Sequence, residues 1–181
     1  MRIYLRPVTV DDASNIVKWR NSPSVMNHSF NKTPITIESN IAFYKANVET
    51  GKYKRFIVER IEEDFGVSSY PIATVYLKDL DMVNRRCELC IFTSDDEEWN
   101  TESQSIAIRM LLKKAFCGYQ MHKVYTYVFS KNEDEISLMK SAGLKIEALL
   151  KEEALDINGN YIDAVRMSIF SDEYEEGRTN E

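Results

Sequence analysis

Residues 88–116, ELCIFTSDDEEWNTESQSIAIRMLLKKAF, decide which fold this sequence predicts. The stretch opens inside a predicted strand at residues 86–93, which is rich in apolar side chains. An acidic run at residues 95–98 follows and is typical of a solvated loop. A helix is predicted over residues 103–116, because apolar side chains fill nearly all of its inward positions. The stretch therefore predicts a strand, an acidic loop and a long buried helix.

The flanking sequence predicts further strands and helices around this unit. Alternating or β-branched runs indicate strands at residues 3–7, 55–60, 72–77, 124–129, 146–150 and 164–170. Helical spacing indicates helices from Asp11 or Asp12 to a turn at residues 19–23, from Thr36 to Gly51, and from Asn132 to Gly143. The Asn158-Gly159 pair predicts a hairpin between the last two strands. This order predicts an α+β fold, in which helices flank a mixed, mostly antiparallel sheet.

The composition predicts one domain at residues 1–170, followed by an acidic tail at 171–181. The chain has 181 residues, of which 44% are apolar, and this is enough for a single core. The start MRIYLRPVTV lacks the apolar run of a secretory signal, and no window reaches the 18 or so apolar residues of a membrane helix. We therefore expect a cytoplasmic protein with no membrane partner. Three cysteines and two histidines match no zinc-site spacing, so we expect no metal.

The net charge narrows the classes of partner. The chain carries a formal charge of -6 and has no Lys/Arg cluster. Nucleic-acid phosphates would be repelled by such a chain, so we expect no nucleic-acid partner. Cationic or neutral amines are more compatible with this overall charge.

Residues 88–116 also resemble, position by position, the acetyl-CoA-binding unit of the GNAT N-acetyltransferases. In that pattern a strand Glu-Leu-Gly-Ile-Tyr-Ile leads to Trp-Gly-Lys-Gly-x-Gly-Thr-Glu-Ala and an apolar helix ending in Ala-Phe. The three loop glycines of the pattern fall on Asn100, Glu102 and Gln104 here. Other motifs resemble the branch that acetylates ribosomal-protein N-termini, polyamines and nucleotide-linked amino sugars: Trp19-Arg20-Asn21, Pro34-Ile35-Thr36, Asn84-Arg85-Arg86, His122-Lys123-Val124 and Tyr161-Ile162-Asp163.

The resemblance implies a fold, an activity and a cofactor site. It implies transfer of an acetyl group from acetyl-CoA to a primary amine of a small molecule or a protein N-terminus, with a homodimer as a possible assembly. It places the pantetheine arm between residues 87–93 and 124–129, and the pyrophosphate at the start of the following helix, where free amides and the helix dipole attract anions. The implied cofactor contacts are Ile91, Phe92, Thr93, Thr101, Glu102, Ser103, Gln104, Ser105, Ile106, Asn132 and Met139.

The resemblance also places a catalytic carboxylate at Glu88, which would take a proton from the incoming amine. The other interpretation of Glu88 is a cross-strand partner for an Arg or a Lys. Asn132 has two compatible interpretations, a helix cap and a cofactor contact. Met139 occupies the position of a proton-donating Tyr in many relatives, and a thioether cannot donate a proton. The implied substrate contacts are Trp19, Arg20, Asn21 and His28.

A second class of function stays open on the sequence. Glu102 would repel a phosphate, and Met139 cannot protonate a departing thiolate. A protein that kept the fold and lost the chemistry, serving as a binding or regulatory protein, is therefore the alternative. Stabilisation by CoA or acetyl-CoA separates a chain that binds the cofactor from one that does not.

Overall fold

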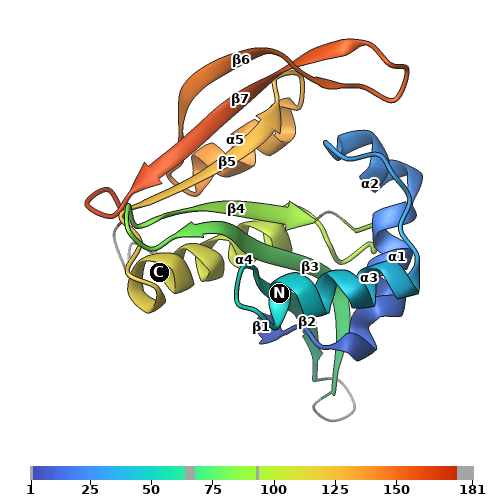
Figure 1. Cartoon of the computed structure of the whole chain (residues 1–181). Helices are drawn as coiled ribbons and strands as arrows, with labels where there is room; N and C mark the ends of the chain where they lie inside the picture. Colours follow the sequence, from blue (N-terminus) through green and yellow to red (C-terminus); the bar gives the residue numbers. More distant parts are fainter. Residues whose placement is uncertain (1, 64–67, 93, 175–181) are drawn as a thin grey trace.

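The computed structural model describes residues 2–63, 68–92 and 94–174 of the chain (Figure 1). The strands are β1 (Ile3–Pro7), β2 (Lys54–Glu62), β3 (Ser68–Asp81), β4 (Arg86–Phe92), β5 (Lys123–Phe129), β6 (Lys145–Leu155) and β7 (Tyr161–Phe170). The helices are α1 (Ala13–Asn21), α2 (Pro23–His28), α3 (Ile37–Phe43), α4 (Thr101–Lys113) and α5 (Glu133–Ser141). A 3₁₀ turn, Val10–Asp12, precedes α1, and wider π turns, Tyr44–Val48 and Lys114–Gly118, extend α3 and α4.

The seven strands form one sheet in the order β1-β2-β3-β4-β5-β7-β6. Every neighbouring pair is antiparallel except β4 and β5, which run parallel. A parallel pair needs a crossover, and α4 supplies it. The predicted α+β fold with a mixed, mostly antiparallel sheet is therefore confirmed.

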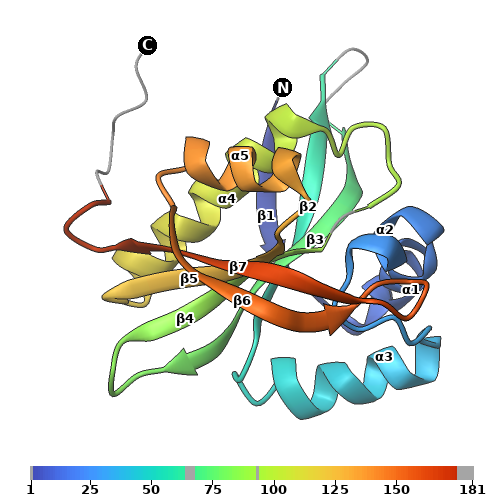
Figure 2. The same ribbon diagram turned by 90° about the horizontal axis from the view of Figure 1, so that it is seen from above.

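Helices cover both faces of the sheet (Figures 1 and 2). On one face, α4 and α5 bury the main core, to which β4 contributes Cys87 and Leu89, both fully buried. On the other face, the N-terminal helices bury a smaller cluster around Trp19 and Ile57. Because successive side chains of a strand point to opposite faces, Glu88 and Cys90 of β4 lie on the side of the N-terminal helices.

Local sequence explains where most elements begin and end. The Thr36 side chain accepts a hydrogen bond from the Ser39 amide and starts α3. Gly143 adopts a φ of +94° just after α5, in the left-handed region that glycine tolerates. In the last hairpin, Asp156 accepts hydrogen bonds from the amides of Asn158 and Asn160, which closes a turn with Gly159 at a φ of +80°.

The first helix ends within the expected turn at residues 19–23, because α1 stops at Asn21 and Ser22 is extended, but a second helix that the sequence analysis did not predict follows at once. Ser22 caps α2 by accepting a hydrogen bond from the Val25 amide, and Pro23 fills the first helical position, where a missing N–H costs nothing. Ser22 thus both ends α1 and caps the start of α2. This short helix lies at the end of the sheet toward which β4 and β5 open (Figure 1).

One predicted cofactor contact and most of the predicted acidic tail lie outside the described residues. These are Thr93 and residues 175–181. Among the helices that the structure describes, none has the length and hydropathy needed to cross a bilayer.

Candidate active site

The centre of the sheet contains a gap between two neighbouring strands. β4 and β5 pair only from Arg86↔Lys123 to Glu88↔Tyr125. Beyond Glu88 the two strands diverge, and Figure 1 shows them opening toward α2. The backbone groups of residues 89–92 and 126–129 that face this gap make no ladder with each other. Unpaired strand edges are available to bond an extended polar ligand in the manner of an added strand.

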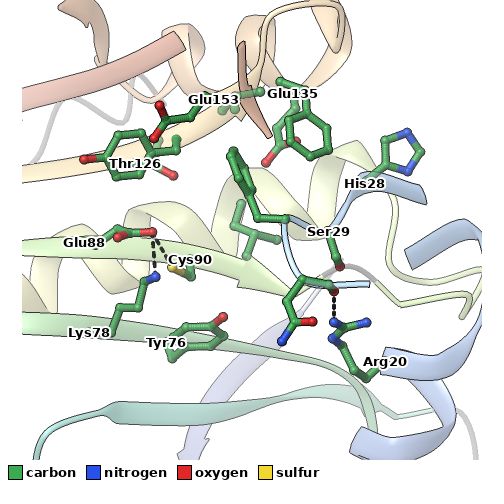
Figure 3. Close-up of a pocket in the computed structure, with 16 residues that line it drawn as sticks. Arg20, His28, Ser29, Tyr76, Lys78, Glu88, Cys90, Thr126, Glu135 and Glu153 are labelled. Atoms are coloured by element: carbon green, nitrogen blue, oxygen red, sulfur yellow. Dashed lines mark hydrogen bonds and ion pairs between the residues drawn. The ribbon is translucent and has the colours of Figure 1, made fainter. Parts of the chain in front are cut away.

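A cavity of about 370 Å³ lies at this gap (Figure 3). Its walls come from β3, β4 and β5, from the N-terminal end of α5, and from the segment that follows α2, and Arg20 of α1 and Glu153 of β6 complete them. This volume lies at the lower end of the range for small-molecule sites. The cavity therefore joins residues that are distant in the sequence, including Arg20, Lys78, Glu88 and Glu135.

Glu88 is the buried carboxylate of this cavity. One of its oxygens lies 3.2 Å from the Lys78 ammonium of the adjacent strand, and it accepts a hydrogen bond from the Cys90 thiol at 3.2 Å. The Glu88 side chain is 10% exposed. Burial raises the pKa of Glu88, and the Lys78 ammonium offsets only part of that rise. A carboxylate with a raised pKa inside a cavity is suited to accept a proton, and its role in catalysis stays a prediction. The cross-strand partner expected for Glu88 is confirmed as Lys78.

Cys90 and Tyr76 complete the floor of the cavity beside this ion pair. They face each other across β3 and β4, as do Lys78 and Glu88 two residues further along. Burial and the adjacent Glu88 carboxylate raise the pKa of the Cys90 thiol well above its usual range. Cys90 is therefore a neutral thiol that donates to Glu88, and not a nucleophilic thiolate.

The start of α5 contributes a second carboxyl group. Asn132 caps the helix by accepting from the Glu135 amide at 3.2 Å, as its predicted cap requires, and it donates to the Glu135 carboxyl at 2.7 Å. Burial raises the pKa of Glu135 to about 7. Glu135 lines the cavity, while the carboxamide of Asn132 is engaged on both sides by Glu135. Cofactor contact by Asn132 stays a prediction.

Met139 lies one helical turn after Glu135 but does not line the cavity. Its side chain is fully buried among the residues of the main core. It therefore fills space in the main core, and cofactor contact by Met139 stays a prediction. Its thioether cannot donate a proton to a departing thiolate.

The four predicted substrate contacts divide into two pairs. Arg20 and His28 both line the cavity. Trp19 is 3% exposed and packs in the smaller core cluster. Asn21 brackets Ile35 with both ends of its carboxamide, at 2.7 and 2.9 Å, and so ties α1 to the segment before α3. Trp19 and Asn21 thus support the position of α1 and of the segment before α3.

The start of α4 is already capped by the chain itself. Asn100 accepts hydrogen bonds from the amides of Glu102 and Ser103, at 3.1 and 3.3 Å. The Ser103 hydroxyl is buried and donates to the Glu98 and Asn100 carbonyls, and the Gln104 amide group donates to the Trp99 carbonyl. Two of the amides that would hold a pyrophosphate therefore already donate to the Asn100 side chain. An anion reaches them only after Asn100, which is exposed, turns away.

The remaining predicted cofactor residues lie near the cavity or at the start of α4. Ile91 lines the cavity, and the backbone of Phe92 pairs with Thr74 on β3. Thr101 and Glu102 are exposed on the first turn of α4. Ser105 accepts a hydrogen bond from Arg109, and Ile106 packs against the main core. The structure therefore separates the predicted contacts into a cavity group and a helix-start group.

Sequence reasoning did not assign several lining residues to the site, and those with polar or ionisable side chains include Tyr76, Lys78, Cys90, Glu135 and Glu153. Lys78 and Tyr76 belong to β3, and only the register between β3 and β4 brings them beside Glu88 and Cys90. The alternation of side chains along β3 can be read from the sequence, but the register between β3 and β4 cannot. Among the described residues, no group of three His, Cys, Asp or Glu side chains is arranged to hold a metal ion.

Comparisons with known proteins agree with this geometry. The family model of the GNAT acetyltransferase domain matches residues 2–145. Spermidine N(1)-acetyltransferase of Escherichia coli (strain K12) is 27% identical over 172 residues, which cover 95% of this chain and 88% of that protein. The corresponding enzyme of Vibrio cholerae is 24% identical over 173 residues, with 96% and 95% covered. The crystal structure of a Vibrio cholerae spermidine N-acetyltransferase with CoA and spermine superposes with a TM-score of 0.85 at 24% identity, covering 95% of this chain and 97% of that one.

The divergence of β4 from β5 and the helix that follows β4 are the features that the GNAT pattern implied for acetyl-CoA binding. The family match extends over most of the chain and includes both features. The chain therefore belongs to the GNAT family, as an N-acetyltransferase that uses acetyl-CoA.

Proposed function

We propose that this chain transfers the acetyl group to a primary amine, of a small molecule or a peptide N-terminus, bound in the cavity beside Glu88. The observation that carries the proposal is the position of Glu88, a buried carboxylate at the last paired residue before β4 and β5 diverge. The gap beyond it would hold the extended arm of the cofactor, and the cavity of about 370 Å³ would hold the amine. Both reactants would then meet at Glu88.

Acetyl-CoA supplies the acetyl group as a thioester. The amine nitrogen attacks the carbonyl carbon, so that a C–N bond forms and the C–S bond breaks. Glu88 takes the proton that the nitrogen must lose, either directly or through a water molecule. Backbone N–H groups of β4 that face the gap would polarise the carbonyl group as charge develops on its oxygen. A thiol has a pKa of about 8.5, so the departing sulfur needs no strong acid near neutral pH.

The helix start would hold the phosphate end of the cofactor. The first-turn amides of α4 point at this site, and Asn100 would have to turn away from Glu102 and Ser103 to release them. Glu102 is exposed, so water and salt screen its carboxylate. The carboxylate therefore weakens the binding of a phosphate less than a buried carboxylate would. The residues of this chain therefore fit the cofactor, at the expense of one helix cap.

The names of the relatives make a polyamine the first acceptor to test. The homodimer and the cytoplasmic location predicted from the sequence remain predictions. A melting experiment with acetyl-CoA tests the binding step, because a ligand at 100 times its dissociation constant stabilises the fold by about 2.7 kcal/mol. Release of CoA thiol that depends on an added amine tests the transfer step. Binding without transfer to any amine would favour the binding or regulatory alternative.

A further inference from the structure

Glu88 and Glu135 line the cavity from different walls (Figure 3). Glu88 belongs to β4, on one side of the gap, and β4 and β5 begin to diverge there. Glu135 belongs to the first turn of α5, which follows soon after β5 ends at Phe129 on the other side. The gap between these strands would hold the extended arm of acetyl-CoA. The two carboxyl groups would therefore lie on two sides of the reacting end of that arm.

A hydrogen bond fixes the Glu135 carboxyl group. Its oxygen Oε2 accepts from the Asn132 carboxamide at 2.7 Å, so Oε1 is the oxygen that can carry a proton. The side chain is partly exposed, and the burial that remains raises its pKa to about 7. An ordinary thiol has a pKa of about 8.5, so transfer of a proton from Glu135 to a thiolate is favourable. Glu135 is therefore an acid of suitable strength for a departing thiolate.

The place of Glu135 on its helix also suits this role. Met139 occupies the position of a proton-donating Tyr in many relatives, and its thioether has no proton to give. Residues four apart share a face of a helix, so Glu135 lies one turn before Met139 on the same face of α5. Long side chains on a helix point back over the preceding turn. The hydroxyl group of such a Tyr would therefore lie over the turn that carries Glu135.

Two other acids of the cavity hold their protons too tightly to replace Glu135. Burial raises the pKa of the Cys90 thiol and of the Tyr76 phenol well above their ordinary values, so both are weaker acids than an ordinary thiol. On α5 itself, Glu133 and Asp134 are exposed. Tyr127 carries a hydroxyl group and is the rival donor. The remaining ionisable side chains of the lining are Arg20, His28, Lys78 and Glu153.

We propose that Glu135 is the acid of the reaction, with its carboxyl group beside the sulfur of bound acetyl-CoA. This inference rests on the proposed acetyl transfer. A neutral amine gives one proton to Glu88 as the C–N bond forms. The C–S bond breaks, its electron pair stays on the sulfur, and the sulfur takes the proton of Glu135. Glu88 then carries one proton more and Glu135 one proton fewer, and exchange through water restores both.

The pH dependence of turnover tests this role. Glu135→Gln keeps an oxygen that accepts the hydrogen bond from Asn132, but it cannot give a proton. We expect its kcat to be at least about tenfold below that of the wild type at about pH 6. The wild type should lose this advantage as the pH rises through about 7, because its acid ionises. A ratio of the two kcat values that does not change with pH would overturn the inference, since Glu88 is present in both proteins and its ionisation cancels.

Two further variants separate Glu135 from its neighbours. Glu133→Gln is the matched control, because Glu133 is an exposed carboxylate on the same turn of α5 and does not line the cavity. Its kcat should equal that of the wild type at both ends of the pH range. Tyr127→Phe removes the hydroxyl group of the rival donor. A loss of turnover in Tyr127→Phe, together with wild-type turnover in Glu135→Gln, would assign the proton to Tyr127 and overturn the inference.

The thiol of bound CoA locates the sulfur without any amine. At a pH well above 7, Glu135 is a carboxylate, and its negative charge opposes the ionisation of an adjacent thiol. The ultraviolet absorbance of the thiolate, with desulfo-CoA as the blank, measures the pKa of that thiol. We expect this pKa to be about one unit higher in the wild type than in Glu135→Gln. Equal values would place the sulfur away from Glu135 and overturn the inference.

The outcomes distinguish this inference from the proposed function. If Glu135→Gln does not fold, the wild-type profile decides: a kcat that falls as the pH rises through about 7 supports the inference, and a kcat that stays level or rises overturns it. Wild-type turnover in Glu135→Gln rejects the inference and leaves acetyl transfer intact. A protein that binds CoA and acetylates no amine contradicts the proposed function, and the thiol pKa still decides whether Glu135 lies beside the sulfur. Absence of CoA binding rejects both.

Discussion

Replacement of Glu88 by glutamine separates the catalytic interpretation of this residue from the structural one. Glutamine keeps the shape of the side chain and can still accept the hydrogen bond from Cys90, but it cannot take a proton. General-base catalysis contributes about 10²- to 10⁴-fold. We therefore expect Glu88→Gln to lower kcat by about a hundredfold or more, with the dissociation constant of acetyl-CoA nearly unchanged in calorimetric titration.

The ion pair with Lys78 complicates a single substitution. At the observed 3.2 Å, an effective dielectric constant near 20 gives an attraction of about 5 kcal/mol, which is an upper bound because both groups also lose hydration. Removal of one partner of a fully buried pair costs about 3–5 kcal/mol. The Lys78 side chain is 27% exposed, and contact with water should reduce the loss in unfolding free energy to about 1–3 kcal/mol. A loss of turnover accompanied by such destabilisation is ambiguous on its own.

The double variant Glu88→Gln, Lys78→Met resolves the ambiguity, because it removes the unpaired ammonium. We expect the double variant to regain most of the lost unfolding free energy in urea titration and to remain as slow as Glu88→Gln. Lys78→Met alone should raise the pKa of Glu88 further, since the ammonium lowers it. The rising limb of the pH–rate profile should then move to higher pH, because the base must be ionised. Recovery of turnover in the double variant would refute the catalytic role and leave Glu88 as a partner for Lys78.

The remaining predictions concern the start of α4 and the start of α5. Glu102→Gly should tighten CoA by up to about tenfold at low salt, and the gain should shrink with salt because screening removes the repulsion; an unchanged dissociation constant would mean that this exposed carboxylate points away from the phosphates. Asn100→Gly should tighten CoA in a salt-independent manner, because it frees two amides and costs the helix only a few tenths of a kcal/mol; weaker binding would indicate that Asn100 itself contacts the cofactor. The pKa of Glu135 is raised from 4.5 to about 7, so the unfolded chain ionises first and about 3 kcal/mol of unfolding free energy is lost as the pH rises through that window. In urea titrations at pH 4.5 and 7, Glu135→Gln should reduce this loss of unfolding free energy, whereas replacement of the exposed Glu133 by glutamine should not. An equal loss between the two pH values in both variants would contradict the assignment of this pH dependence to Glu135.

Local patterns were sufficient to predict most of the fold. Strand alternation and helical spacing depend on neighbouring residues, so the strands and the long helix after β4 were predictable, with boundaries that moved by a few residues. The helix α2 was not predicted, because Ser22-Pro23 is compatible with a turn and with a helix start, and only the packing of Val25 in the smaller core cluster decides between them. The parallel pairing of β4 with β5 is a long-range contact that no local pattern in the sequence specifies.

The site was less predictable than the fold because it depends on long-range register. Glu88 was identified from its position on the strand, but its partner Lys78 is ten residues away across a turn with irregular register. The cap at Asn100 is a local interaction that the substitution of a glycine by Asn could have indicated. Arg20 of α1 and Arg55 of β2 line one further cavity, and only the tertiary structure brings these two elements together.

The most direct measurement quantifies both products of one reaction, the CoA thiol by a colorimetric thiol reagent and the acetylated amine by mass spectrometry. The protein is incubated with acetyl-CoA and a panel that contains anionic, neutral and polycationic primary amines. The account predicts that thiol and N-acetylated amine appear in equal amounts, and that neither appears faster than in the protein-free control when the amine is omitted. Calorimetric binding of acetyl-CoA without formation of any N-acetylated amine across the panel would contradict it.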